Sequence, residues 1–519
     1  MKKIFIIAAV FFIALGSGCK KFLNVDSLDS LSGNNFWKTR QDMESFTREV
    51  YRLFREGVAI RSGLIMVGDL RCMPVGPGAY PPRGDFSLLA NNQIKTLVTT
   101  RREQNNVDTY WQLHGAWDYI GDWSPIYKVI QSANILFDKA PSVKASDASI
   151  TDAMVKRYQA EAVFMRCVSY FFMIRLFGDV PYYTDAYNDA PLPRTKDVEV
   201  ARACLAELEA YKEYLPWTPD DPANRAVRAM RGSALALEMY FNMWLAGIDP
   251  ANAKSYYEAT DRLGDELRSS GAYRLLPLSD IALVFAGRSE EGLFEVPQNV
   301  NYGDVLGNIR RTFTGAVLHY PYIQLNENSS KSELTYTNGY LKKLYPEDIT
   351  DGRKTKWFDK NIYNEDGTMQ CFKFFNLALG ENNTTASLSN YFIIFRYAGT
   401  LLLQAEALAN LDKGSSKAKT LLNEVRTRAG ADAYIGGNAG ADVENELGDA
   451  IFWEERRELI GEGHAYYDMV RTRKVYDPRY CDRPILYGNF VRGAWTWPIN
   501  AKALVNNPYM TLNTYWGNN

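Results

Sequence analysis

The chain has 519 residues, with 59 lysines and arginines against 61 aspartates and glutamates, and a formal net charge of -2 at pH 7. This balance, without a basic stripe, argues against nucleic acid as a partner. Only three histidines and six cysteines occur, without the spacing of metal ligands. We therefore expect no metal, no cofactor and no disulfide framework.

The first residues predict export. Met1, Lys2 and Lys3 form a basic start, residues 4–15 are apolar, and the small residues 16–18 precede Cys19. The apolar run is shorter than the roughly 20 residues that span a bilayer as a helix. We predict a lipoprotein signal peptide over 1–18, a lipid anchor on Cys19 and one large domain over 19–519. A soluble secreted protein with an incidental cysteine is the alternative.

A loop-rich excursion is predicted at about residues 61–122, where prolines and glycines cluster between positions 74 and 84. Long irregular segments on a rigid frame often carry binding surfaces. The polar candidates in this excursion are Asp69, Arg71 and Arg83, and the aromatic candidates are Trp111, Trp117 and Tyr119.

Helical periodicity then dominates the chain. Long helices are predicted over 123–137, 152–177 and 198–215, followed by a helix pair over 232–267 that breaks at Asp249 and Pro250. A second pair is predicted over 390–411 and 416–429, and another helix over 447–461. The paired segments have the size and small-residue pattern of tetratricopeptide-type repeats.

A second loop-rich excursion is predicted at about residues 276–389, where the helical periodicity fades. Short strand-like runs occur there at 292–296 and 371–375. Its candidate ligand residues are Tyr302, Tyr320 and Tyr322. The predicted fold class is all-α: a tetratricopeptide-like helical-repeat scaffold with long irregular loops and a few short strands.

Several motifs, in order along nearly the whole chain, resemble those of the SusD/RagB-like family of outer-membrane lipoproteins. The quoted segments are 35–37, 127–134, 160–181, 271–275, 396–408, 422–430, 455–464, 497–499 and 507–508. Each motif is weak alone, and their shared order is specific. The resemblance implies a cell-surface, lipid-anchored protein of the outer membrane. It would capture an oligosaccharide and present it to a SusC-like TonB-dependent transporter.

Three functions remain open at this level. The first is a nonenzymatic glycan-binding protein, for which aromatic rings would stack on sugar faces and polar side chains would bind hydroxyls. Of the rings, Trp111 is favoured over Trp123, which begins a helix. The second is the same scaffold binding a peptide or another non-sugar nutrient. The third, a glycoside hydrolase, is disfavoured because Glu454, Glu458 and Glu462 lie on one helix surface among arginines, whereas catalytic carboxylates flank a sugar from two sides.

Overall fold

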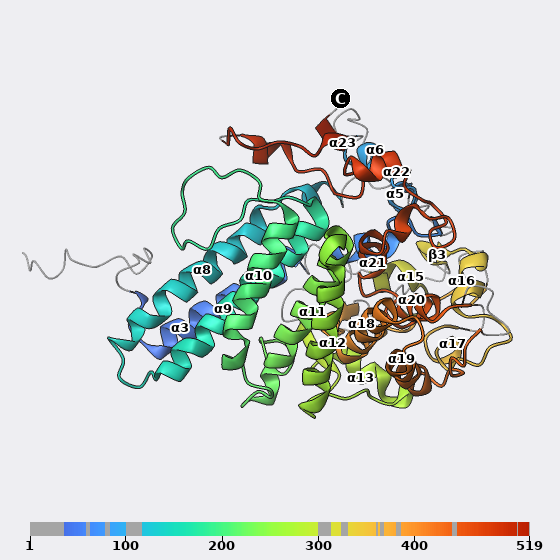
Figure 1. Cartoon of the computed structure of the whole chain (residues 1–519), viewed down its shortest axis with the longest axis horizontal. Helices are drawn as coiled ribbons and strands as arrows, with labels where there is room; N and C mark the ends of the chain where they lie inside the picture. Colours follow the sequence, from blue (N-terminus) through green and yellow to red (C-terminus); the bar gives the residue numbers. More distant parts are fainter. Residues whose placement is uncertain are drawn as a thin grey trace, which may run out of the picture.

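The computed structural model describes residues 36–58, 63–77, 84–99, 117–298, 313–322, 331–359, 362–363, 368–379, 386–437, 444–505 and 507–517. The scaffold is helical, as predicted (Figure 1). Its long helices are α3 (Arg40–Val58), α8 (Ser124–Lys144), α9 (Asp152–Phe177), α10 (Asp197–Tyr211), α11 (Arg231–Ile248), α12 (Ala253–Ser269), α18 (Tyr397–Leu411), α19 (Ser416–Arg428), α20 (Leu447–Glu458) and α21 (Ala465–Arg471).

The helices pack as antiparallel neighbours across the molecule. In Figure 1, α3, α8, α9 and α10 lie side by side at one end, α11 and α12 occupy the middle, and α18 to α21 lie at the other end. Single-turn helices connect some of them: η3 (Lys212–Tyr214), η4 (Pro222–Asn224), η5 (Pro250–Asn252) and η8 (Lys474–Tyr476). Among the described residues, no helix combines the length and hydropathy needed to cross a membrane.

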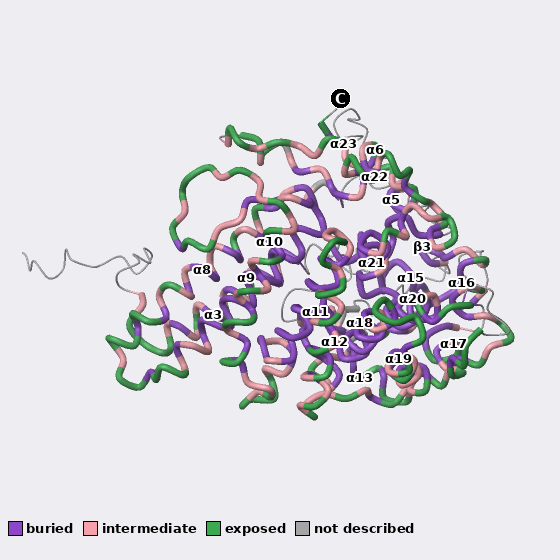
Figure 2. Tube along the Cα trace, in the orientation of Figure 1, coloured by how far each residue is buried: buried purple, intermediate pink, exposed green. Residues whose placement is uncertain are grey.

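Sequence pattern explains why these helices lie where they do. Helix α3 buries a stripe at Met43, Thr47, Val50 and Phe54, spaced three or four residues apart, so it packs through one face. In α9 and α11, by contrast, most of the length is buried on all sides, and both helices run through the interior (Figure 2). The Thr151 hydroxyl accepts a hydrogen bond from the Met154 backbone and caps the start of α9.

Both loop-rich excursions contain short elements. The first holds α4 (Gly63–Leu70), β1 (Val75–Pro77), α5 (Gly84–Ala90), α6 (Ile94–Thr99) and η2 (Asp118–Gly121). The second holds η6 (Leu278–Asp280), α13 (Ile281–Ala286), β2 (Gly292–Val296), α15 (Phe313–Val317), β3 (Leu334–Tyr336), α16 (Asn338–Leu344), α17 (Arg353–Lys356), β4 (Leu377–Leu379) and β5 (Ala386–Leu388), with β6 (Phe392–Arg396) just after it. The C-terminal segment adds α22 (Tyr487–Val491), η9 (Ala501–Leu504) and α23 (Thr514–Gly517).

The strands join segments that are distant in sequence. Strands β1 and β3 pair antiparallel, with Val75 opposite Tyr336, so the two excursions meet in one small sheet. Strand β2 pairs antiparallel with β6, and β4 pairs antiparallel with β5. The chain therefore brings residues 63–77 against the second excursion.

Two local predictions were wrong. Residues 392–396 form strand β6 instead of the start of a helix, because they pair with β2 and the helix begins only at Tyr397. Residues 371–375 are not a strand: Cys371 makes a single bridge to Phe358, and the chain then turns.

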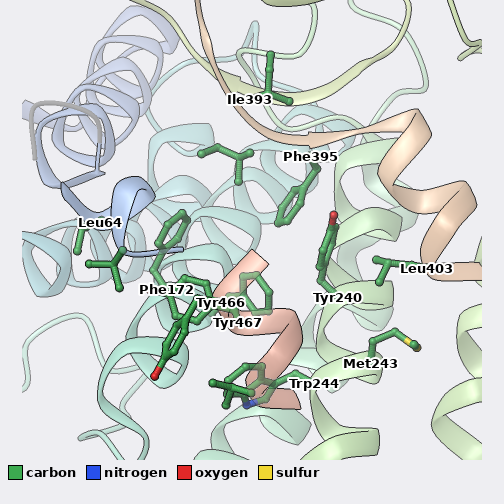
Figure 3. Close-up of a cluster of buried hydrophobic side chains, with 14 of the residues drawn as sticks. Leu64, Phe172, Tyr240, Met243, Trp244, Ile393, Phe395, Leu403, Tyr466 and Tyr467 are labelled. Atoms are coloured by element: carbon green, nitrogen blue, oxygen red, sulfur yellow. The ribbon is translucent and has the colours of Figure 1, made fainter. Parts of the chain in front are cut away.

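One large hydrophobic core connects the scaffold to the excursions. Figure 3 shows its centre, where Phe172 of α9, Tyr240 of α11, Phe395 of β6 and Tyr466 of α21 come together. Backbones also approach closely at Gly68 in α4, where an added Cβ would lie 1.9 Å from the Gly463 carbonyl oxygen. Only glycine fits at this contact between the first excursion and the turn before α21.

Candidate functional site

Asp69 lies inside the protein. Its side chain is 2% exposed, and its two carboxylate oxygens accept hydrogen bonds from the backbone N–H groups of Gly461 and Gly463, at 3.2 and 2.8 Å. Burial raises its pKa to about 8, although the two N–H groups and Lys373 oppose this shift. Asp69 thus fastens α4 to the turn before α21, and the prediction that it contacts a ligand is corrected.

Arg71 is also buried, at 1% exposed. Its guanidinium group donates to the carbonyl oxygens of Ala494, Trp495 and Thr496 at 2.6 to 3.2 Å and lies 4.7 Å from the centre of the Tyr466 ring. Its Nε–H also donates to the side-chain oxygen of Asn92 at 2.8 Å, so each nitrogen of the guanidinium group is bonded within the protein. Its predicted ligand contact is therefore corrected to a structural role: it holds the end of α4 against that segment.

Trp117 fills the core. The ring is 1% exposed, and its indole N–H donates to the Asp85 carboxylate at 2.8 Å. A ring in this position cannot present a face to a sugar, so this candidate is also corrected. Tyr119 is partly buried and packs against the same core.

Tyr320 and Tyr322 lie at the surface of the second excursion. Tyr320 is partly buried, and Tyr322 is 36% exposed. The neighbouring His319 is held in place: its ring nitrogens lie 2.7 Å from the Tyr320 carbonyl oxygen and 3.1 Å from that of Thr368. The segment that carries the two tyrosines is thereby attached to the start of the segment 368–379.

Two phenylalanines that the sequence pattern does not indicate as ligand residues stand beside Tyr322. The Tyr322 ring meets Phe372 at 4.8 Å and Phe375 at 5.2 Å between ring centres, both edge to face. Phe375 is 40% exposed. We call Tyr322, Phe372 and Phe375 the aromatic patch. Exposed large rings that touch one another are unusual on a surface and are typical of binding sites.

The aromatic patch has a rigid base. Between its two phenylalanines, Lys373 points inward, and its ammonium group donates to the carbonyl oxygens of Glu458 and Ile460, both at 2.8 Å, and to Glu462 at 2.5 Å. Phe374 packs in the core, 4.8 Å from Phe285. Two consecutive inward side chains therefore hold the surface rings in position.

Lys373 belongs to a buried ion network that gathers charges from six parts of the sequence. Its acids are Glu291, Asp351, Glu444, Glu454, Glu458 and Glu462, and its bases are Arg353, Lys373, Arg396, Arg426, Arg428 and Arg457. Every one of these side chains is at most 6% exposed. Six negative and six positive charges balance, as burial in a low dielectric requires.

The network argues against hydrolysis by the carboxylates of the predicted helix 447–461. Burial alone would raise the pKa of Glu454, but Arg353, Arg457 and Arg426 outweigh it and hold the pKa far below its usual value. Burial also opposes ionisation of Glu462, yet Arg396 and Lys373 lower its pKa to about 2. A general acid for glycoside cleavage needs a raised pKa. Glu454 and Glu462 are instead ionised and paired with buried arginine and lysine side chains.

A separate cleft of about 840 Å³ opens between the helix ends of the scaffold. It is lined by parts of α11, α12, α18 and α20 and by the residues after α21, including Tyr257, Glu406, Asp449, Phe452 and Lys474. None of the predicted ligand residues that the structure describes lines this cleft. The aromatic patch and the cleft are therefore different features.

Four predicted residues, Cys19, Arg83, Trp111 and Tyr302, lie outside the described residues. Their predicted roles stay predictions.

Comparison with known proteins finds relatives along the whole chain. The sequence model of the SusD family matches residues 319–516, and one described as "Starch-binding associating with outer membrane" matches residues 86–240. The chain is 25% identical to SusD-like protein P38 of Formosa agariphila, over 99% of each chain.

Solved structures share the fold. A SusD homologue from Bacteroides thetaiotaomicron has a TM-score of 0.81 and 38% identity, covering 93% of this chain and 99% of that one. Surface glycan-binding protein A from Bacteroides uniformis has a TM-score of 0.66 and 20% identity, covering 92% of this chain and 100% of that one.

Proposed function

Because this chain belongs to the SusD family, we propose that it is a nonenzymatic, cell-surface protein of the outer membrane that captures an oligosaccharide. The observation that carries this proposal is the aromatic patch, in which Tyr322 and Phe375 are exposed, Phe372 is partly buried and all three stand on a rigid base. Flat rings at fixed positions stack on the apolar faces of sugars. The relatives support the ligand class through two descriptions, starch-binding and glycan-binding.

The proposed ligand surface combines described and undescribed residues of the two excursions. The described part consists of Tyr320 and the aromatic patch, which includes Tyr322, with Tyr119 nearer the core. We also assign to this ligand surface three residues that the structure does not describe: Arg83, Trp111 and Tyr302. The meeting of the two excursions at the β1–β3 sheet supports a shared surface, since it joins both segments.

Calorimetry with oligosaccharides chosen from a glycan array tests this function. Replacing Tyr322 or Phe375 by Ala should weaken binding by about threefold to tenfold each, the value of ~0.5–1.5 kcal/mol for one aromatic contact. Trp111→Ala should do the same without unfolding the protein. The matched control is Tyr187→Ala, because Tyr187 is 58% exposed and lies between α9 and α10, outside both excursions.

The outcomes of this screen separate the alternatives. Binding of peptides by a protein that binds no glycan would replace the proposed ligand by a non-sugar nutrient. Release of reducing sugar, abolished by a single carboxylate substitution, would identify a hydrolase and contradict the proposal.

Anchoring and partnership are the remaining parts of the proposal. After removal of residues 1–18, a lipid on Cys19 would tether one domain, residues 19–519, to the outer membrane facing the cell exterior, beside a SusC-like TonB-dependent transporter. Cys19→Ser should move the protein from the membrane fraction to the soluble fraction. Affinity purification of the wild-type protein from solubilised membranes should recover the transporter, and recovery without it would contradict the partnership.

A further inference from the structure

The cleft between the helix ends is large enough for a small ligand. Its volume of about 840 Å³ lies within the range of ~300–1,000 Å³ that is typical of small-molecule sites. Its walls come from helices that pack on one another, α11 against α12, α18 and α21 (Figure 1). At Gly247 of α11, an added Cβ would lie 2.1 Å from the carbonyl oxygen of Arg471, so two of these walls are in close contact. The scaffold therefore fixes the walls of the cleft.

The most buried cation of the cleft is already neutralised. Arg471 is 6% exposed, and its guanidinium group donates to both carboxylate oxygens of Glu406 at 2.7 Å and to Asp468 at 2.8 Å. Because Arg471 is fully engaged within the protein, the capacity to bind a ligand rests on the more exposed cations of the cleft.

Two consecutive cations follow α21 and line the cleft. Arg473 has a positive φ of 60°, which is uncommon for a residue other than glycine, and it donates to the Gly247 carbonyl oxygen at 3.0 Å. The Lys474 ammonium group lies 4.3 Å from the centre of the Tyr480 ring and 5.2 Å from that of Phe452. Among the described residues, neither Arg473 nor Lys474 forms an ion pair with a carboxylate.

Two acids in the surroundings of these cations have other partners. Asp477 forms an ion pair with Arg479 at 2.7 Å, and Asp449 accepts a hydrogen bond from the Tyr480 hydroxyl at 2.6 Å. Over the whole lining, five cationic side chains stand against three acidic ones, although the chain carries a net charge of -2. The cleft is therefore a local region of positive charge, which favours an anionic ligand.

The cleft also offers aromatic surface. Four rings line it: Tyr257, Tyr434, Phe452 and Tyr480. Phe452 and Tyr480 meet edge to face at 5.2 Å between ring centres. Aromatic walls with a few charged and hydroxyl groups are the lining that sugars require. Cations without ion pairs distinguish this cleft from the aromatic patch, where Lys373 points inward.

We propose that this cleft is a second ligand site of the protein, which binds a short acidic oligosaccharide. A carboxylate or sulfate group of the sugar pairs with Arg473 and Lys474, and the sugar rings lie against the aromatic walls. The assignment to a sugar rests on the proposed function, whereas the preference for an anion follows from the cleft itself. The acidic glycan is bound at a place separate from the aromatic patch.

Calorimetry on the purified full chain tests this site with three short oligosaccharides. Trigalacturonate carries carboxylates, a carrageenan oligosaccharide carries sulfates, and maltotriose is neutral. We expect at least one acidic oligosaccharide to bind about tenfold more tightly than maltotriose, because charge-assisted hydrogen bonds are stronger than neutral ones. Its affinity should fall as the salt concentration rises. Failure of both acidic oligosaccharides to bind would overturn the proposal.

A charge substitution locates the binding. Lys474→Met should weaken binding of the acidic oligosaccharide by about tenfold, the loss of one charged contact. The matched control is Lys156→Met in α9, whose ammonium group also lies over tyrosine rings, 5.4 Å from the centre of Tyr211 and 5.7 Å from that of Tyr214, outside the cleft. This control should bind like the wild type.

A substitution that fills the cleft provides an independent measurement. Gly448 of α20 lines the cleft, and a Cβ added there meets nothing within 4 Å. Gly448→Trp should therefore abolish binding of the acidic oligosaccharide without a large change of the melting temperature. Its control is Gly488→Trp in α22, where an added Cβ is equally unobstructed and which does not line the cleft.

The remaining outcomes separate this site from the proposed function. Acidic binding that Lys474→Met and Gly448→Trp leave unchanged would overturn the second site, and its loss in Phe375→Ala alone would assign the acidic sugar to the aromatic patch. Acidic binding lost in Gly448→Trp supports the cleft even where no neutral glycan responds to Phe375→Ala, a result that contradicts the function of the patch. Equally tight binding of a hexaglutamate peptide would overturn the assignment to a sugar.

Discussion

Replacing Lys373 by Met tests whether the buried ion network positions the aromatic patch. The Lys373 side chain is completely buried, and its ammonium group contacts one carboxylate and two carbonyl groups. Burial lowers its pKa, and Glu462 partly restores it. Methionine keeps the length and apolar volume of the chain and removes only the charge and the three donors.

The expected cost follows from what each partner retains. Glu462 keeps two bonds from Arg396 at 2.8 Å, and the Glu458 carbonyl keeps one from Arg396 at 2.7 Å. Among the described residues, only Lys373 donates a hydrogen bond to the Ile460 carbonyl, and the substitution removes it. Breaking a buried ion pair costs about 3–5 kcal/mol. Because Arg396 still neutralises Glu462, we expect about 3 kcal/mol, the low end of this range.

Calorimetric melting measures this loss. Unfolding entropies of about 2.1 cal/mol/K per residue give ~1 kcal/mol/K for a chain of this length, so the melting temperature should fall by about 3 °C. Binding to any glycan recognised by the wild type should also weaken, because Phe372 and Phe375 flank Lys373. The control is Lys254→Met, whose lysine is 81% exposed beside Glu258 and should change little. A Lys373→Met protein that melts with the wild type would refute this reasoning.

Three further substitutions probe the scaffold. Burial lowers the pKa of His464 from 6.5 to about 4. The stabilisation by the neutral ring is therefore complete above pH 6.5 and is lost as the pH falls through 4, which changes the free energy of unfolding by about 3 kcal/mol in all. In urea titrations at several pH values, His464→Gln should lack this dependence of the unfolding free energy on pH. Gly68→Ala should destabilise by at least ~1–3 kcal/mol, because its Cβ would overlap the Gly463 carbonyl, whereas Gly76→Ala, which meets nothing within 4 Å, should not. Trp117→Phe keeps the buried ring but removes the indole hydrogen bond to the buried Asp85 carboxylate, and its expected cost in thermal unfolding is about 1–3 kcal/mol.

Helix positions could be predicted from the sequence because they are local properties. The predicted helix 152–177 coincides with α9, whose start is capped by Thr151 and whose end is set by Gly178, which has a positive φ of 70°. Strand β6 was missed because its apolar residues run directly into α18 without a turn signal. Only its pairing with β2, roughly a hundred residues earlier in the chain, makes this segment a strand.

The site was harder to predict because exposure depends on partners that are remote in sequence. Asp69 and Arg71 stand in a loop-rich, polar segment and resemble ligand residues, yet backbone groups of the C-terminal third bury both. The sequence pattern predicts a strand over residues 371–375, and a strand does not indicate that Phe372 and Phe375 lie beside Tyr322. The feature of the sequence that indicates an inward turn is Lys373, a charged residue among four aromatic or apolar neighbours in residues 371–375.

The motifs that identify the family and the residues proposed to bind ligand belong to different parts of the fold. Three arginines of the family motifs face inward, and their guanidinium groups form ion pairs within the buried ion network: Arg396, Arg426 and Arg428. They specify a scaffold and leave the ligand undetermined. The link between the two parts is Lys373, which ends in the network while its neighbours Phe372 and Phe375 reach the surface. A change of ligand specificity can therefore arise at the exposed rings without disturbing the charges beneath them, whereas a change at Lys373 should affect binding and stability together.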